Sequence, residues 1–176
     1  MPRPDLSRIP QYYHKYINQA KEDDLVSALE NNTHTFLSLL KIIPPDKRDH
    51  RYAEGKWTVK EVLQHIIDTE RVFTYRALRF ARKDQTPLPG YDQNIFAVSA
   101  KADKRNWDDL VDEFTYHRKA TEIMFGSFDN EQMESAGIAS DVSVYVLGIG
   151  YIIAGHCAHH MNILKEKYLE KENQPA

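Results

Sequence analysis

Two histidines near the C-terminal end of the chain have the spacing of a metal-binding pair. His156 and His160 are four residues apart, and on a helix such residues share one face with their Cβ atoms about 5–6 Å apart. A third histidine, His65, lies far upstream in a segment with helical periodicity. If the three imidazoles converge, they can bind one divalent cation, with two ligands from one helix and the third from another.

The surroundings of these histidines favour an inward orientation. On a helical wheel, His156 and His160 project from an apolar stripe that also holds Ile149 and Ile163, and His65 faces inward in its own helix. Buried imidazoles need partners, so three explanations compete: a hydrogen-bonded histidine pair in the core, a pH-sensitive interface, and metal ligation. Three inward histidines on two helices are hard to satisfy without a metal.

Two neighbouring side chains offer alternative ligands. His159 lies close to His156 on the helical wheel and is the second choice for either member of the pair. Cys157 lies three residues before His160, so a set of Cys157, His160 and His65 is a further alternative. A lone buried cysteine more often behaves as a small apolar residue, which is the reading we prefer for Cys157.

The composition restricts the class of protein. The net charge is -3, from 23 basic and 26 acidic residues, which is the wrong sign for a protein that binds nucleic acid. The longest apolar stretch, residues 142–157, is interrupted by glycines and falls short of the ~20 residues that a membrane helix needs. The chain also has a single cysteine and shows no apolar signal segment. We therefore expect a cytoplasmic protein that binds neither nucleic acid nor membranes.

Helical periodicity dominates the chain and predicts one all-α domain over residues 1–176. Residues 1–20 are expected to form an N-terminal strap and residues 170–176 a flexible tail. Thr58 and Glu61 have the spacing of a capping box and mark the start of the second long helix. The expected long helices cover residues 21–41, 58–82, 106–125 and 143–169.

A segment rich in proline separates the second and third of these helices. Residues 83–105 read as a loop of about twenty residues, and loops of that length inside a compact domain are often functional or crossover segments. Joined in this way, the second and third helices run parallel, which predicts a four-helix bundle with one long crossover. Glycines inside the last helix indicate close approach of a neighbouring backbone.

Several motifs together resemble the DinB/YfiT-like superfamily, over residues 36–169. They lie in the second helix, in the segment after it and in the last helix: Lys56-Trp57-Thr58 with Glu61, Leu63, His65, Asp68 and Glu70, then Pro87-Leu88-Pro89-Gly90-Tyr91-Asp92, then Gly155-His156-Cys157-Ala158-His159-His160-Met161-Asn162-Ile163-Leu164. The resemblance implies a four-helix bundle that forms a homodimer. It also implies a divalent ion bound by His65, His156 and His160.

The resemblance also implies a range of activities. Relatives with known reactions resemble thiol-dependent enzymes, including bacillithiol S-transferases and mycothiol-dependent maleylpyruvate isomerase, while many members have no assigned reaction. Many members carry glutamate between the two histidines of the last helix, where this chain has Cys157 and Ala158. A catalytic acid or base must therefore come from elsewhere, and Asp68, Glu61 and Asp92 are the candidates.

Three neutral imidazoles leave a coordination position open, which is typical of catalytic rather than structural sites. Such an ion can lower the pKa of a bound water or thiol toward neutrality. Zinc and nickel suit three nitrogen ligands best, and manganese or iron are alternatives. The sequence thus predicts an enzyme that uses a thiol or water to transfer to, or hydrolyse, a small electrophilic substrate, with residues 83–105 forming one wall of the pocket.

Two further hypotheses remain open. In the first, the protein is a non-catalytic dimeric stress-response or binding module, in which the ion only fixes two helices together. In the second, the metal site is degenerate and binds no ion. The low-molecular-weight thiol is a partner only under the enzyme hypothesis.

Overall fold

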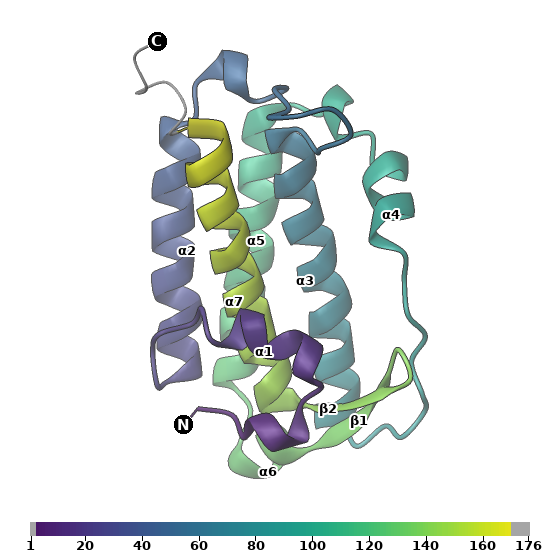
Figure 1. Ribbon diagram of the computed structural model, residues 1–176. Coiled ribbons are helices and arrows are strands. Elements are labelled where there is room, and N and C mark those ends of the chain that lie inside the picture. The colour runs from purple at the N-terminus through teal and green to yellow at the C-terminus, as the bar shows by residue number, and fades with distance from the viewer. Residues whose placement is uncertain (1–2, 170–176) are drawn as a thin grey trace.

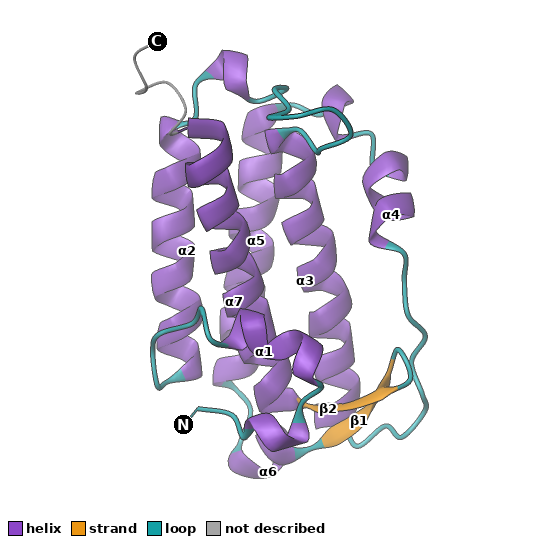
Figure 2. Ribbon diagram, viewed as in Figure 1, coloured by secondary structure: helices purple, strands orange, loops and turns teal. Residues whose placement is uncertain are grey.

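Four long helices lie side by side in a bundle in the computed structural model, which describes residues 3–169 (Figure 1). The bundle confirms the predicted all-α class and is joined by short helices and one pair of strands (Figure 2). Its long helices are α2 (Leu25–Ile42), α3 (Val59–Ala81), α5 (Trp107–Gly126) and α7 (Val146–Ile163). The short elements are η1 (Leu6–Arg8), α1 (Gln11–Ile17), η2 (Pro45–Lys47), α4 (Gln93–Ser99), η3 (Ala102–Lys104), α6 (Asn130–Glu134), β1 (Ala136–Ala139), β2 (Val142–Tyr145) and the π-helical turn η4 (Leu164–Leu169).

The order of the long helices follows from one crossover. Helices α3 and α5 run in the same direction, and the chain between them climbs back along the outside of the bundle, on the right in Figure 1. Helix α7 packs between α2 and α3, and α5 packs against the same two helices from the other side. This arrangement places one face of α3 directly against α7.

The start of α3 is fixed by the predicted capping box. The Thr58 hydroxyl accepts a hydrogen bond from the Glu61 amide at 3.1 Å, and the Glu61 carboxylate accepts one from the Thr58 amide at 2.7 Å. Helix α5 has a similar start, because the Asn106 side chain accepts from the amides of Asp108 and Asp109. Such caps satisfy amides that have no partner within the helix and set where the helix begins.

The crossover contains more structure than the sequence predicts. Helix α4 lies within the segment expected to be a loop, and the Asp92 side chain caps it by accepting from the Asn94 and Ile95 amides. Before α4, the Leu88 amide donates to Ile138 O at 2.9 Å and Leu88 O accepts from the Ser140 amide at 3.0 Å. These two bonds hold the crossover against the strand pair.

The strand pair also corrects the expected start of the last helix. Residues 143–145 belong to β2, which pairs antiparallel with β1, and α7 begins only at Val146. The two turn residues, Ser140 and Asp141, both have positive φ values of 53° and 62°. That conformation belongs to a type I′ turn, which matches the twist of a hairpin and is usually built from Asn-Gly.

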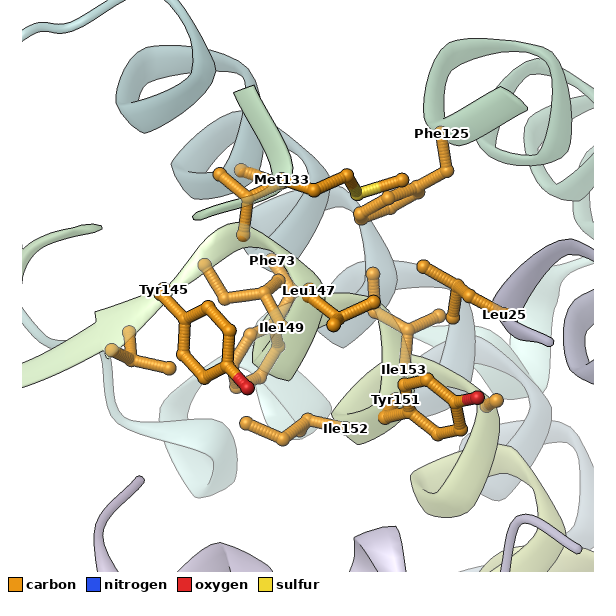
Figure 3. Packing of buried hydrophobic residues seen from close by; sticks show 14 of the residues in the cluster. Leu25, Phe73, Phe125, Met133, Tyr145, Leu147, Ile149, Tyr151, Ile152 and Ile153 are labelled. Atoms are coloured by element: carbon orange, nitrogen blue, oxygen red, sulfur yellow. The ribbon is translucent and has the colours of Figure 1, made fainter. Parts of the chain in front are cut away.

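A layer of buried polar side chains divides the apolar core in two. Around the first half of α7, one cluster contains Phe73, Phe125 and Ile149 (Figure 3). Around the other end of the bundle, a second cluster contains Leu63 and Phe114. The polar residues between the two lie on facing helices and are nearly inaccessible to solvent: Thr69, Glu70, Arg118 and His156.

Helix α1 lies across α7 in direct backbone contact. A Cβ atom added at Gly155 would come within 1.9 Å of Tyr16 O, so only glycine allows the two helices to meet at this point. The predicted close backbone approach therefore occurs at Gly155, whereas Gly148 and Gly150 make room for the side chains of Ile9 and Leu25. The Gly155 contact places the tyrosines of α1 beside the following residue of α7.

Within residues 3–169, no helix is long and apolar enough to cross a membrane. The expected tail, residues 170–176, lies outside the part of the chain that the structure describes.

Candidate metal centre

Three imidazoles from α3 and α7 meet in the interior of the bundle. His65 Nε2 and His160 Nε2 each lie 3.1 Å from His156 Nε2. The three residues are buried, with 6–9% of their surface exposed. The structure thus brings together the three histidines proposed as ligands.

Hydrogen bonding alone does not satisfy this arrangement. A neutral imidazole nitrogen carries either one proton or one lone pair. His156 Nε2 faces two other ring nitrogens, so both contacts compete for the same proton or the same lone pair. A cation, in contrast, accepts a lone pair from each nitrogen at once.

The spacing of the nitrogens suits a metal ion. Zinc–nitrogen bonds of about 2.0–2.1 Å in tetrahedral geometry separate two ligand nitrogens by about 3.3 Å. The distances of 3.1 Å from His156 to both neighbours are close to that value, and one ligand atom from each residue lies within 4.8 Å of the other two. The residues present therefore fit a divalent ion.

Burial keeps the three imidazoles neutral. Loss of hydration lowers the pKa of His65 to about 4 and that of His160 to about 3, and it holds the pKa of His156 well below its usual range. Neighbouring histidines further lower the pKa of His156 and of His160. Neutral rings near pH 7 offer the lone pairs that a metal requires.

Aromatic side chains and one threonine hold two of the rings. Trp57 lies against His65 with ring centroids 4.6 Å apart, and Tyr16 meets His156 edge-on at 5.5 Å. The Thr69 hydroxyl lies 3.4 Å from His65 Nδ1. In contrast, His160 Nδ1 is buried and has no hydrogen-bond partner in the described structure.

The two alternative ligands point elsewhere. His159 Nδ1 lies 3.3 Å from Gln19 Nε2, and its ring packs against Tyr16 rather than joining the three nitrogens. Cys157 is fully buried on the side of Arg118, and loss of hydration raises the pKa of its thiol to about 12. Neither side chain belongs to the group that the structure brings together.

A partly open cavity of about 240 Å³ borders His65 and His156. Its wall combines three tyrosines from α1, residues of one face of α3, residues of the crossover and the hairpin, and one residue of α7: Tyr12, Tyr13, Tyr16, Thr69, Phe73, Arg76, Tyr91, Gln93, Ser140 and Ile152. A second cavity, of about 230 Å³, borders His160 and includes Trp57 and Tyr168. The histidine cluster is therefore reached from two sides.

The three carboxylates predicted as catalytic candidates lie outside the first cavity. Glu61 caps α3 and pairs with Arg51 at 2.9 Å, and Asp92 caps α4. Asp68 accepts a hydrogen bond from Gln64 at 2.9 Å, and burial raises the pKa of its carboxyl group. All three are engaged in local contacts, and their role as proton-transfer groups stays a prediction.

Arg76 and the tyrosines of the cavity wall are not among the residues that the sequence predicts for the site. Arg76 is eleven residues after His65 on α3, which is three turns and a rotation of only about 20°. Extending the inward face of His65, Thr69 and Phe73 by one turn would have identified it. For the tyrosines of α1, no comparable signal exists, because their position depends on how α1 docks on α7.

The sequence model of the DinB superfamily matches residues 28–164 of the chain. The protein therefore belongs to the DinB superfamily, as the motifs predict. No curated protein matches the sequence.

Among solved structures, the fold is similar to that of YfiT from Bacillus subtilis. The TM-score is 0.70 at 14% sequence identity, and the match covers 94% of this chain and 90% of YfiT. That protein is described as a probable metal-dependent hydrolase with an unusual four-helix bundle topology. At this identity the similarity establishes the fold, and it agrees with the bundle and crossover described above.

Proposed function

We propose that this protein is a metal-dependent enzyme that directs water or a low-molecular-weight thiol against a small electrophilic substrate. The observation that carries the proposal is the pair of contacts at His156 Nε2, which a shared cation satisfies and hydrogen bonds do not. The description of YfiT as a metal-dependent hydrolase supports the same class of chemistry. Zinc or nickel fits three nitrogen ligands best, with manganese or iron as alternatives.

The ligand set itself favours a catalytic role. His65, His156 and His160 would hold the ion through neutral nitrogens and leave a position that protein does not fill. When bound, a divalent ion supplies a Lewis acid that lowers the pKa of a water or thiol ligand. No carboxylate lies in the histidine cluster or lines the first cavity within residues 3–169, so nothing there weakens the positive charge.

Side chains around the cluster keep the ligands in place. Trp57 and Tyr16 pack against two of the rings, and Thr69 links His65 to Tyr91 through contacts of 3.4 and 2.9 Å. Such supporting contacts orient a ligand ring and typically change metal affinity by about 10–100-fold when they are removed. Side chains of α1 and of the crossover thus support the histidine rings.

The cavity wall suits the positioning of a small organic molecule. Burial raises the pKa of Tyr13, Tyr16 and Tyr91, so their hydroxyl groups stay protonated and available as hydrogen-bond donors. Their rings and that of Phe73 supply apolar surface around the entrance. A substrate held there is shielded from bulk water on several sides and faces the histidines.

Metal content and turnover of the same preparation test the proposal. Untagged protein should contain close to one divalent ion per chain, and the loaded protein should turn over activated esters with water or alkylating electrophiles with an added thiol. The variant His160→Ala should lose both the metal and the activity. His34→Ala, which changes an exposed histidine of α2, is the matched control and should retain both.

Two outcomes would contradict the proposal. Full metal content in His160→Ala would remove this residue from the ligand set and direct attention to His159. Stoichiometric metal without turnover of any electrophile above background would reject the enzyme.

A purely structural metal site is the second candidate, because His65 lies on α3 and the other two ligands lie on α7. An ion there would tie two long helices together and stabilise the bundle. This reading predicts a large drop in Tm on chelation and no exchangeable water on the metal in spectra of the cobalt-loaded protein. An exchangeable water would favour the enzyme.

A further inference from the structure

Arg76 carries a positive charge into the cavity wall without a negative partner. Only 3% of its surface is exposed, and a guanidinium stays protonated at any physiological pH. Its Nη2 donates to Pro89 O at 3.1 Å and to Ser140 Oγ at 2.9 Å, and its charge lies 5.3 Å from the centre of the Phe73 ring. All three partners are neutral, and within residues 3–169 no carboxylate forms an ion pair with Arg76.

A second buried arginine, Arg118, has the carboxylate partner that Arg76 lacks. Arg118 is also inaccessible, and it forms three hydrogen bonds of 2.7–2.9 Å with the carboxylate of Glu70. A buried charge is costly unless an opposite charge compensates it. Arg118 has that compensation within the protein, whereas the cavity beside Arg76 leaves room for an anion from outside.

Arg76 lies on the same face of α3 as His65. Arg76 and His65 line the same cavity, and their Cα atoms are offset by about 16 Å along α3 because eleven residues each rise about 1.5 Å. Thr69 and Phe73 lie between them on the same face. A molecule that reaches from one end of the cavity to the other therefore has a cationic contact at one end and the proposed metal at the other.

We propose that Arg76 binds a carboxylate group of the substrate, so that the cavity takes a small carboxylate-bearing molecule with its reactive group toward the histidines. This inference rests on the proposed function for the reaction, but not for the binding of the anion. The planar guanidinium matches the two oxygens of a carboxylate. Tyr13 lies beside Arg76 in the same cavity wall.

Arg76 also has a structural role that the test must separate. Its bonds to Pro89 and Ser140 join the crossover to the hairpin. A variant that loses ligand binding because this junction loosens would mimic loss of the anion site. Ser140→Ala removes one of the two bonds and keeps the charge, so it isolates the structural contribution.

Calorimetric titration of the metal-free protein at pH 7.5 with benzoate and with benzamide is the direct experiment. These two probes have nearly the same shape and differ in charge. Wild-type protein should bind benzoate at least about tenfold more tightly than benzamide, as expected for charge-assisted hydrogen bonds. Arg76→Gln should abolish the difference, while Arg76→Lys and Ser140→Ala should retain most of it.

Equal binding of the two probes by the wild-type protein would overturn the inference, and so would a benzoate preference that persists in Arg76→Gln. If Arg76→Gln does not fold, the wild-type comparison and Arg76→Lys still decide. His160→Ala should bind benzoate as the wild type does, since this contact does not involve the metal. Failure of metal binding with intact benzoate preference would reject the proposed function alone.

Discussion

Two buried polar clusters lie side by side in the bundle and are built on opposite principles. Around Arg118, every strong donor has a partner: Glu70 accepts three hydrogen bonds and Asn32 Oδ1 accepts one at 2.9 Å. The cluster of His65, His156 and His160 has no counter-ion and borders two cavities. Both clusters use residues of α3, five positions apart.

The polar groups around Arg118 are all paired and stabilise the fold, whereas the ring nitrogens of the histidine cluster remain open to a ligand. A buried ion pair with all its hydrogen bonds formed has no capacity left for a ligand. Neutral rings that face one another with unshared lone pairs are ready to bind one. Cys157 illustrates the boundary, since it follows His156 in sequence but lies by Arg118, where its raised pKa of about 12 keeps it a thiol.

Among the substitutions, the largest effect should come from removing the charge at Glu70. Glu70→Gln leaves the Arg118 guanidinium buried without its carboxylate, and breaking such a pair typically costs about 3–5 kcal/mol. We expect the free energy of unfolding in urea to fall by that amount while the folded fraction still binds metal. The double variant Glu70→Leu/Arg118→Met, which removes both charges, should lose much less, and an equal loss would show that the two charges do not compensate each other.

Acidification of the metal-free protein should also lower its stability. The folded pKa values of about 4 at His65 and about 3 at His160 lie below the unfolded value of about 6.5, so unfolding takes up protons. Stability should be complete above pH 6.5 and fall between pH 6.5 and 4 by about 1.4 kcal/mol per pH unit for each histidine that becomes protonated. His160→Ala should reduce this slope, and an unchanged slope would assign it to other groups.

The smallest effect should follow from the loss of one supporting hydroxyl. Thr69→Val keeps the shape of the side chain but removes the oxygen near His65 Nδ1, and we expect about a tenfold weaker metal affinity in competition with a chelator. Thr121→Val is the matched control, because Thr121 is also buried and its hydroxyl donates to His117 O. Equal affinities in both variants would mean that Thr69 does not support the ligand.

Local signals in the sequence predicted most of the fold. The capping box of Thr58 and Glu61 sets the start of α3, and the prolines of residues 83–105 predict the crossover. The hairpin was missed because its turn uses Ser140 and Asp141 at positive φ in place of the usual Asn-Gly. Helix α4 was missed because seven residues are too short for a periodic pattern.

The candidate site was predictable only where its residues lie on the inward faces of helices. Spacing and inward orientation identified His65, His156 and His160. That Glu61 and Asp92 cap helices follows only from their hydrogen-bond partners in the structure. Which residues wall the cavity depends on how α1, the crossover and the hairpin pack together. Those contacts are made between distant segments, and no local pattern encodes them.

Because α1 docks on α7 at Gly155, the N-terminal segment supplies part of the cavity wall without supplying a proposed metal ligand. Helix α1 brings Tyr12, Tyr13 and Tyr16 to the cavity, yet it contributes none of the three histidines. Under the proposed function, substitutions in the seven residues of α1 would change which molecules the cavity accepts during evolution. The proposed metal ligands of α3 and α7 would be inherited unchanged.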